Sequence, residues 1–255
     1  MVELQITSTI DGSKEPVLFE FPQDKTNVPL FVGLHTWSFD RFNQVDAMLP
    51  LCQERGWALL LPEFRGANLN NNPRALQACA STLAIQDVID AVDFIAQNYA
   101  IDPTQIFLMG GSGGGHMALM MAGHAPNKWR AISAWVPITD LATWHSENEK
   151  YAPHIATCCG GKPGEITDID RAYQARSPMS YLDTIAQANL YVHHGRHDAS
   201  VPYTHTFKLA QEIEKRNPKN FYFEIFDGGH QLRYDVAFKW FESQLKTENQ
   251  KTLTG

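Results

Sequence analysis

The sequence has no excess of positive charge. Its 255 residues carry 21 lysines and arginines against 28 aspartates and glutamates, a formal charge of −7 at pH 7. Such a chain lacks the basic face that binds nucleic acid or anionic membranes, so neither is expected as a main partner. Low-complexity composition is also absent, because 17 glycines and 14 prolines are ordinary counts for this length. The 44% of apolar residues excludes a disordered chain and supplies a buried core.

Long apolar runs and cysteines are both scarce. Stretches such as residues 57–61 are far shorter than the roughly 20 residues that a membrane helix needs. The polar start of the chain lacks the basic segment followed by an apolar one that marks a signal peptide. Four cysteines do not form a disulfide framework, and the neighbours Cys158 and Cys159 would be strained if bonded to each other. We therefore expect reduced cysteines and a cytoplasmic protein.

Strand-like and helix-like segments alternate along most of the chain, a pattern typical of an α/β fold. Asp11 and Gly12 favour a hairpin between the first two strands, and the later strands are short apolar runs typical of a parallel sheet buried on both faces. Strands are expected at residues 4–10, 16–21, 29–35, 57–64, 105–110, 131–138, 188–194 and 220–226. Helices are expected at residues 42–55, 80–99, 113–122, 203–216 and 234–245.

These elements predict one α/β domain over residues 1–255. Its sheet is mostly parallel and doubly wound, with an antiparallel N-terminal hairpin and helices on both faces. Residues 141–182 are polar, aromatic and rich in glycine and proline, without a long periodic run, so we expect an irregular insertion there, after the sixth or seventh strand. The tail from residue 246 onward is expected to fray.

The run Gly110-Gly111-Ser112-Gly113-Gly114 fits the pattern G-x-S-x-G between a predicted strand and a predicted helix. In this turn the serine sits at a sharp, strained bend, so its neighbours must be small. The bend raises the hydroxyl above the sheet and beside the free N–H groups of a helix N-terminus, which face a developing anion. The pattern predicts Ser112 as a catalytic nucleophile.

Two alternatives remain for this glycine-rich run. Gly113, Gly115 and Ala118 match the G-x-G-x-x-A variant of the dinucleotide-binding fingerprint, with Asp140 near the expected acidic position. A glycine-rich turn can also be purely structural. The dinucleotide fingerprint usually opens its domain, whereas several strands precede this run, so the nucleophile is favoured.

A serine nucleophile needs a general base, and the base needs an orienting acid. Asp198 follows a predicted strand, and His230 follows the next strand and precedes the last helix. The order serine, acid, histidine is that of the α/β hydrolases, and all three residues fall at strand ends, where the sites of open α/β sheets gather. The sequence predicts Ser112, Asp198 and His230 as a catalytic triad. Asp198 could otherwise serve as a turn carboxylate, and His230 as a cap.

The oxyanion of the reaction needs two N–H donors. The Gly113 N–H, after the nucleophile, is the first, and the loop of residues 34–38 should supply the other. By position, the Trp37 N–H is the first choice there and the Thr36 N–H the second. No metal is expected at the cluster of His193, His194, His197 and Asp198, because adjacent strand residues point to opposite faces of the sheet.

The chain resembles the prolyl oligopeptidase and acyl esterase branch of the α/β hydrolases over nearly its whole length. The serine, aspartate and histidine motifs carry the resemblance, together with residues 34–37, 62–66 and 86–94 and with Ser177-Pro178 ahead of Tyr181. The resemblance implies hydrolysis of an ester or amide through an acyl-enzyme, with no cofactor.

Departures from that branch favour a carboxylesterase acting on a small-molecule ester. The peptidases of the branch carry a propeller domain, for which 255 residues leave no room, and commonly an aromatic residue where this chain has Gly113. A paired-glutamate segment of the dipeptidyl-peptidase kind is also missing. A peptidase acting on small peptides or aminoacyl amides remains the alternative, and a non-catalytic hydrolase-fold binding protein is a remote one.

Several side chains are expected to border the substrate crevice, because they lie in or beside loops at the predicted catalytic edge. They are Thr36, Trp37, Phe39, His116, Trp144, Tyr151 and Tyr203. Ordinary packing is the more common role of such side chains. The sequence makes no prediction of the oligomeric state or of the acyl group.

Overall fold

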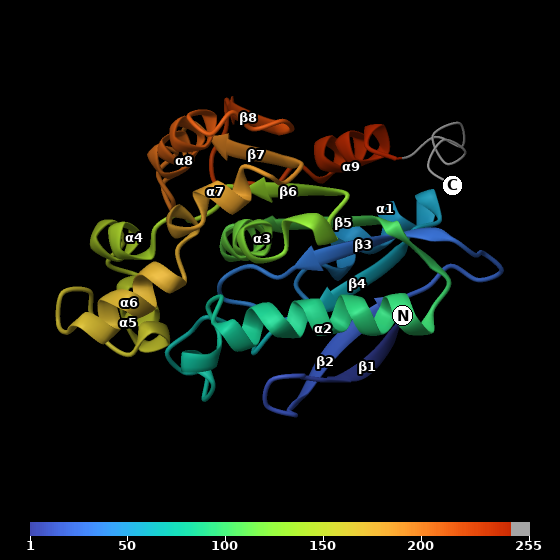
Figure 1. Cartoon of the computed structure of the whole chain (residues 1–255), viewed down its shortest axis with the longest axis horizontal. Coiled ribbons are helices and arrows are strands. Elements are labelled where there is room, and N and C mark those ends of the chain that lie inside the picture. The colour runs from blue at the N-terminus through green and yellow to red at the C-terminus, as the bar shows by residue number, and fades with distance from the viewer. Residues whose placement is uncertain (246–255) are drawn as a thin grey trace.

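The computed structural model describes residues 1–245, and the expected fraying from residue 246 lies outside the described residues (Figure 1). Eight strands form one sheet in the order β1-β2-β4-β3-β5-β6-β7-β8. The strands are β1 (Val2–Thr7), β2 (Lys14–Glu20), β3 (Val28–Leu34), β4 (Ala58–Pro62), β5 (Ile101–Gly111), β6 (Ala131–Trp135), β7 (Leu190–Gly195) and β8 (Phe221–Phe226). β1 and β2 pair with their neighbours in antiparallel fashion, and all other pairs are parallel. The predicted α/β-hydrolase sheet and its N-terminal hairpin are confirmed.

Two of the strand boundaries that differ from the sequence prediction have local reasons. β5 begins at Ile101, so the predicted turn at Asp102-Pro103 lies inside the strand. There the pairing with β3 shifts register between Val28 and Leu30, and this irregularity accommodates the turn. β6 ends at Trp135, three residues early, because Val136 adopts a φ of 41°, which is incompatible with a strand.

Helices cover both faces of the sheet. The longer ones are α1 (Val45–Arg55), α2 (Thr82–Asn98), α3 (Gly113–His124), α8 (Thr204–Glu214) and α9 (Tyr234–Ser243). One core cluster joins α2, α3 and α8 to one sheet face through Val32, Leu108 and Val192, while a second cluster joins α1 and α9 to the other face through Phe31 and Phe107. The apolar strands are therefore buried on both faces, as their continuous hydrophobic runs predict.

The insertion at residues 141–182 follows the sixth strand, but its expected irregularity is wrong. It contains α4 (Leu141–Glu147), α5 (Ala152–Cys159), α6 (Thr167–Ala175), the 3₁₀ turn η3 (Pro178–Ser180) and the first residue of α7 (Leu182–Ile185). These helices have four to nine residues each, too short to show a helical period in the sequence. Helices α4 to α6 gather at one end of the molecule, beyond the carboxyl ends of the parallel strands (Figure 1).

Two of the segments that carry the family resemblance contact each other through Arg65. Its buried guanidinium lies 2.5 Å from a carboxylate oxygen of Asp87 on α2 and 2.8 Å from one of Asp11 in the N-terminal hairpin. These ion pairs join three stretches that are distant in the sequence.

Among residues 1–245, every helix is too short or too polar to span a membrane.

Candidate active site

Ser112 occupies the turn between β5 and α3 with φ 55° and ψ −119°, a conformation that non-glycine residues rarely adopt. Two backbone hydrogen bonds hold it there: the Ser112 N–H donates to the Trp135 carbonyl at 2.8 Å, and the His116 N–H donates to the Ser112 carbonyl at 2.8 Å. Strained residues of this kind cluster at functional sites, and a nucleophile elbow requires this bend.

The glycines around Ser112 are required by close backbone approach. A Cβ atom on Gly110 would lie 2.1 Å from the Gly114 carbonyl oxygen, and one on Gly114 would lie 2.6 Å from the Leu34 carbonyl oxygen. On Gly115 it would lie 2.6 Å from the Trp135 carbonyl oxygen. The start of α3 is thus wedged between the ends of β3 and β6, as a nucleophile elbow demands.

The acidic residue that the dinucleotide-binding alternative requires, Asp140, has another role in the structure. Asp140 is the N-cap of α4, and its carboxylate accepts a hydrogen bond from the Thr143 N–H at 2.8 Å. Capping a helix is an ordinary role for an aspartate after a strand.

Asp198 and His230 meet at the carboxyl edge of the sheet. Asp198 follows β7, His230 follows β8, and the distance between His230 Nδ1 and Asp198 Oδ2 is 2.7 Å. The two loops are joined by a hydrogen bond of 2.8 Å from the His197 N–H to the Gly228 carbonyl. The side chain of Asp198 is fully buried, whereas that of His230 is 29% exposed. The structure therefore places an oriented histidine where solvent can reach it.

The Asp198 carboxylate is held in its charged form. Burial alone would raise the pKa of Asp198, but hydrogen bonds from His194, His230 and the Val201 amide outweigh burial and hold that pKa well below its usual range. Its Oδ1 accepts from the Ser200 and Val201 N–H groups at 2.8 and 2.9 Å. An ionised Asp198 keeps the proton of His230 on Nδ1, so Nε2 is free to act as a base.

The histidine loop also lies against the nucleophile elbow. A Cβ atom on Gly111 would fall 2.4 Å from the side chain of Leu232, two residues beyond His230. The Ser112 hydroxyl and the His230 imidazole are not hydrogen-bonded to each other, and catalytic contacts of this kind often tighten only in the substrate complex. The three predicted triad residues thus come from adjoining loops at one sheet edge.

The Trp37 and Gly113 peptide groups are neighbours. A Cβ atom on Gly113 would lie 2.5 Å from Trp37 N. The Thr36 N–H donates to Asn43 Oδ1 at 3.0 Å, so it is occupied. Neither the Trp37 N–H nor the Gly113 N–H has a hydrogen-bond acceptor in the part of the chain that the structure describes. This arrangement supports the first choice of oxyanion donors over Thr36.

We expect Gly113→Ala to lower kcat by about 100- to 1,000-fold on any substrate that the enzyme turns over, the cost of losing an oxyanion donor. The added methyl group would collide with Trp37 N, Cα and Cβ at 2.5 to 2.9 Å and push the 34–38 loop away. Steady-state kinetics beside a thermal melt would measure this. Gly12→Ala is the control for kcat: its methyl group meets no atom within 4 Å in the distant hairpin, and the φ of 73° at that position costs stability but not turnover. Equal kcat values for Gly113→Ala and wild type would show that the Trp37 N–H is not an oxyanion donor.

The side chains expected at the substrate crevice divide into buried and accessible ones. Trp144 and His116 are at most 1% exposed, so they pack in the interior, and their expected placement at the crevice surface is wrong. Phe39 is 56% exposed, and the residues Thr36, Tyr151 and Tyr203 are partly exposed. The buried Trp37 ring stacks edge-on against Trp144, at 4.9 Å between centroids, so Trp37 offers a substrate only its backbone.

Trp144 and Asn148 instead attach the insertion to the loop that bears Asp198. Trp144 Nε1 and Asn148 Nδ2 both donate to the Ser200 carbonyl, at 3.0 and 2.9 Å. Sequence reasoning missed Asn148, because an isolated asparagine in a polar segment carries no motif. It also missed the contact between His194 and Asp198, at 3.2 Å. The spacing of four residues between His194 and Asp198 is visible in the sequence, but it also fits a metal site and so does not identify this contact.

His193 and His194 do point to different partners. His193 Nδ1 lies 2.9 Å from Glu224, and its ring stacks on Trp135, whereas His194 contacts Val201 and Asp198. Among residues 1–245, no group of three or more histidine, cysteine, aspartate or glutamate side chains is arranged to hold a metal ion.

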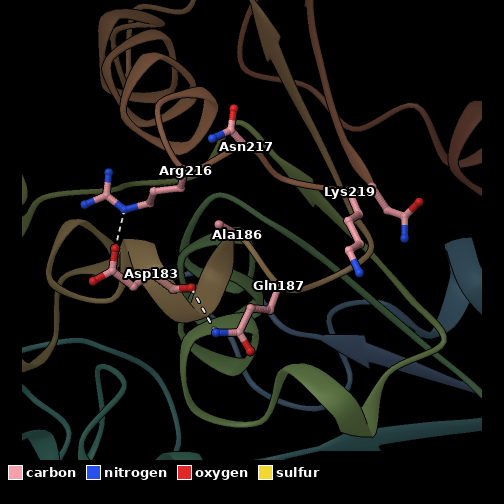
Figure 2. A pocket seen from close by; sticks show the side chains of 7 residues that line it. Asp183, Ala186, Gln187, Arg216, Asn217 and Lys219 are labelled. Atoms are coloured by element: carbon pink, nitrogen blue, oxygen red, sulfur yellow. Dashed lines mark hydrogen bonds and ion pairs between the residues drawn. The ribbon is translucent and has the colours of Figure 1, made fainter.

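A pocket of about 580 Å³ lies away from these residues (Figure 2). Its lining residues are Asp183, Ala186, Gln187, Arg216, Asn217, Lys219 and Asn220. They precede β7 and β8, so the pocket lies at the amino end of these strands, opposite the carboxyl edge that carries Asp198 and His230. An ion pair of 2.5 Å between Arg216 and Asp183 closes one side of it. The pocket is therefore separate from the candidate active site.

Comparisons with known proteins agree with this geometry. The sequence model of the prolyl oligopeptidase family matches residues 43–246. Acylamino-acid-releasing enzyme 1 of Oryza sativa is 26% identical over 220 residues, which cover 80% of this chain and 28% of that protein. The human acylamino-acid-releasing enzyme is 26% identical over 206 residues, which cover 77% of this chain and 28% of that protein. The chain thus spans little more than a quarter of the length of these relatives.

Solved structures show the same fold. The acylaminoacyl peptidase of Pyrococcus horikoshii superposes with a TM-score of 0.78 at 19% identity, covering 96% of this chain and 42% of that one. A puromycin-hydrolyzing peptidase of Mycobacterium tuberculosis gives a TM-score of 0.75 at 18% identity, covering 95% of this chain and 38% of that one. These similarities show a shared fold over less than half of each of the two solved chains.

Proposed function

Since the chain belongs to the prolyl oligopeptidase family, we propose that it is a serine hydrolase that cleaves acyl bonds through an acyl-enzyme on Ser112. The observation that carries this proposal is the hydrogen bond of 2.7 Å between His230 and the buried, ionised Asp198, at the same sheet edge as the strained Ser112 turn. A buried carboxylate that orients a solvent-accessible histidine is the arrangement that activates a serine.

In the proposed reaction, His230 Nε2 takes the proton of Ser112 as its oxygen attacks the carbonyl carbon of the substrate. Asp198 stabilises the resulting imidazolium, and the Gly113 and Trp37 N–H groups hold the oxyanion. His230 then passes the proton to the departing amine or alcohol. Water, deprotonated by the same imidazole, releases the acid and restores Ser112. These steps require no cofactor or metal.

We propose small N-acylated aminoacyl amides or peptides as the substrate class, in place of the carboxylic esters expected from the sequence. The relatives are named as acylamino-acid-releasing enzymes and acylaminoacyl peptidases, which favours the peptidase alternative. The four cysteines are free and buried, as in a reducing compartment, so we propose a cytoplasmic location.

A matched substrate panel tests the substrate class. Activated esters are chemically easy, so their hydrolysis reports only a working serine, whereas amide hydrolysis distinguishes a peptidase. We expect turnover of both an acyl p-nitrophenyl ester and an N-acetyl-aminoacyl p-nitroanilide. The acetylated anilide should have a kcat/KM roughly tenfold or more above that of its free-amine counterpart. A factor of ten corresponds to about 1.4 kcal/mol, the cost of leaving the ammonium group of the free amine unpaired in the site.

Two results would overturn parts of this proposal. Hydrolysis of esters with no detectable cleavage of either anilide would restore the carboxylesterase interpretation. Failure of a fluorophosphonate probe to label the wild-type protein would indicate a non-catalytic binding protein with a hydrolase fold.

A further inference from the structure

His194, near the end of β7, has a fully buried side chain in contact with the proposed catalytic acid. Its Nε2 lies 2.8 Å from the Val201 carbonyl oxygen and 3.2 Å from Asp198 Oδ2. Both neighbours are acceptors, so Nε2 carries a hydrogen that is shared between them. On the other side of the ring, Nδ1 lies 3.0 Å from the Thr206 hydroxyl, which fixes the orientation of the imidazole.

Asp198 is consequently surrounded by donors on both of its oxygens. Oδ1 accepts from the Ser200 and Val201 N–H groups, Oδ2 accepts from the His230 N–H at 2.7 Å, and His194 Nε2 lies 3.2 Å from Oδ2. Rotation of the carboxylate would break several of these contacts at once. Because His194 also binds the Val201 carbonyl, the same N–H ties the turn after Asp198 back to β7.

We propose that His194 is a positioning residue for the hydrolytic reaction, acting through Asp198, an inference that rests on the proposed function. It holds Oδ2 in line with His230 Nδ1, and it draws part of the negative charge of Asp198 toward itself. Both effects change how strongly Asp198 stabilises the protonated form of His230. The role is separate from packing, since a buried leucine of similar size would fill the space without donating a hydrogen bond.

The experiment compares His194→Leu with His194→Gln. We expect the leucine variant to lower kcat by about 10- to 100-fold with little change in KM. This is the size of effect that follows the loss of one hydrogen bond to a charged group. The acidic limb of its kcat/KM profile should move to higher pH, because Asp198 then keeps more charge for protonated His230. Glutamine should recover most of the rate, since its amide carries two N–H donors for Val201 and Asp198.

His193→Leu is the matched control. His193 is equally buried on the same strand, but it contacts Glu224 and Trp135 on the other side of the sheet. A merely structural role for His194 would give both leucine variants the same melting temperature loss and leave both pH profiles at the wild-type position. That result would overturn the inference, as would a glutamine variant no better than leucine.

NMR titration of the His230 imidazole supplies a readout that needs no turnover. The titration midpoint should rise in His194→Leu and stay unchanged in His193→Leu; an unchanged midpoint in both would contradict the positioning role. Lack of hydrolysis and of fluorophosphonate labelling by the wild type would instead refute the proposed function, so the two failures are distinguishable.

Discussion

Replacing Ser112 with alanine is expected to lower kcat by roughly a millionfold, the size of effect that follows removal of the nucleophile in serine hydrolases. The fold should be unaffected, because the Ser112 side chain makes no hydrogen bond within the described residues and alanine meets the same backbone strain at φ 55°. Turnover of an activated ester and a thermal melt would measure the two effects. Mass spectrometry after fluorophosphonate treatment should find the adduct on Ser112 in the wild type alone.

Ser243→Ala is the control for this substitution. Ser243 is an exposed serine on α9, and its hydroxyl donates to the Trp240 carbonyl and accepts from the neighbouring Gln244 side chain. It should keep wild-type turnover and labelling. Retained activity in Ser112→Ala would exclude the acyl-enzyme mechanism, whichever substrate is used.

Asp198→Asn is expected to lower kcat by about 10⁴-fold while leaving substrate binding largely intact. Oδ2 faces the N–H groups of two imidazoles, at 2.7 and 3.2 Å, so an amide NH₂ at this position meets donors instead of accepting from them. His230 can then bond to the asparagine only through an unprotonated Nδ1, which moves its proton to Nε2. In that tautomer the imidazole cannot accept the Ser112 proton.

The same variant predicts a pH dependence of stability. Because the folded protein holds the pKa of Asp198 below its usual range, the ionised carboxylate stabilises the fold above that range. This contribution is lost as the pH falls through the lowered pKa. The difference in the free energy of unfolding between wild type and Asp198→Asn should therefore shrink on acidification, as denaturant titrations at several pH values would show.

Asp227→Asn provides the comparison. Asp227 lies three residues from His230, and its side chain is 94% exposed and pairs with the exposed His197. We expect wild-type kcat and nearly unchanged stability, since exposed ion pairs contribute little. A comparable loss of activity in both variants would indicate a general effect of charge near His230 and would contradict the role of Asp198.

The local patterns of the sequence were sufficient for the α/β sheet, the bend at Ser112 and the order of Ser112, Asp198 and His230. Hydrophobic periodicity, turn chemistry and a spaced motif depend on residues close in the chain, so they can be seen without coordinates. The helices of the insertion at 141–182 could not be predicted in this way, because they are shorter than the window in which a helical period becomes visible.

Only the tertiary structure could decide between candidates that the sequence leaves open. The Thr36 N–H is excluded as an oxyanion donor by a contact with Asn43, and Trp144 is withdrawn from the crevice into a cluster that supports the Asp198 loop. His194 changes from part of an apparent metal cluster to a partner of the acid for the same reason. Each of these outcomes depends on burial or on which acceptor a donor meets, and such contacts arise from packing that no sequence pattern specifies.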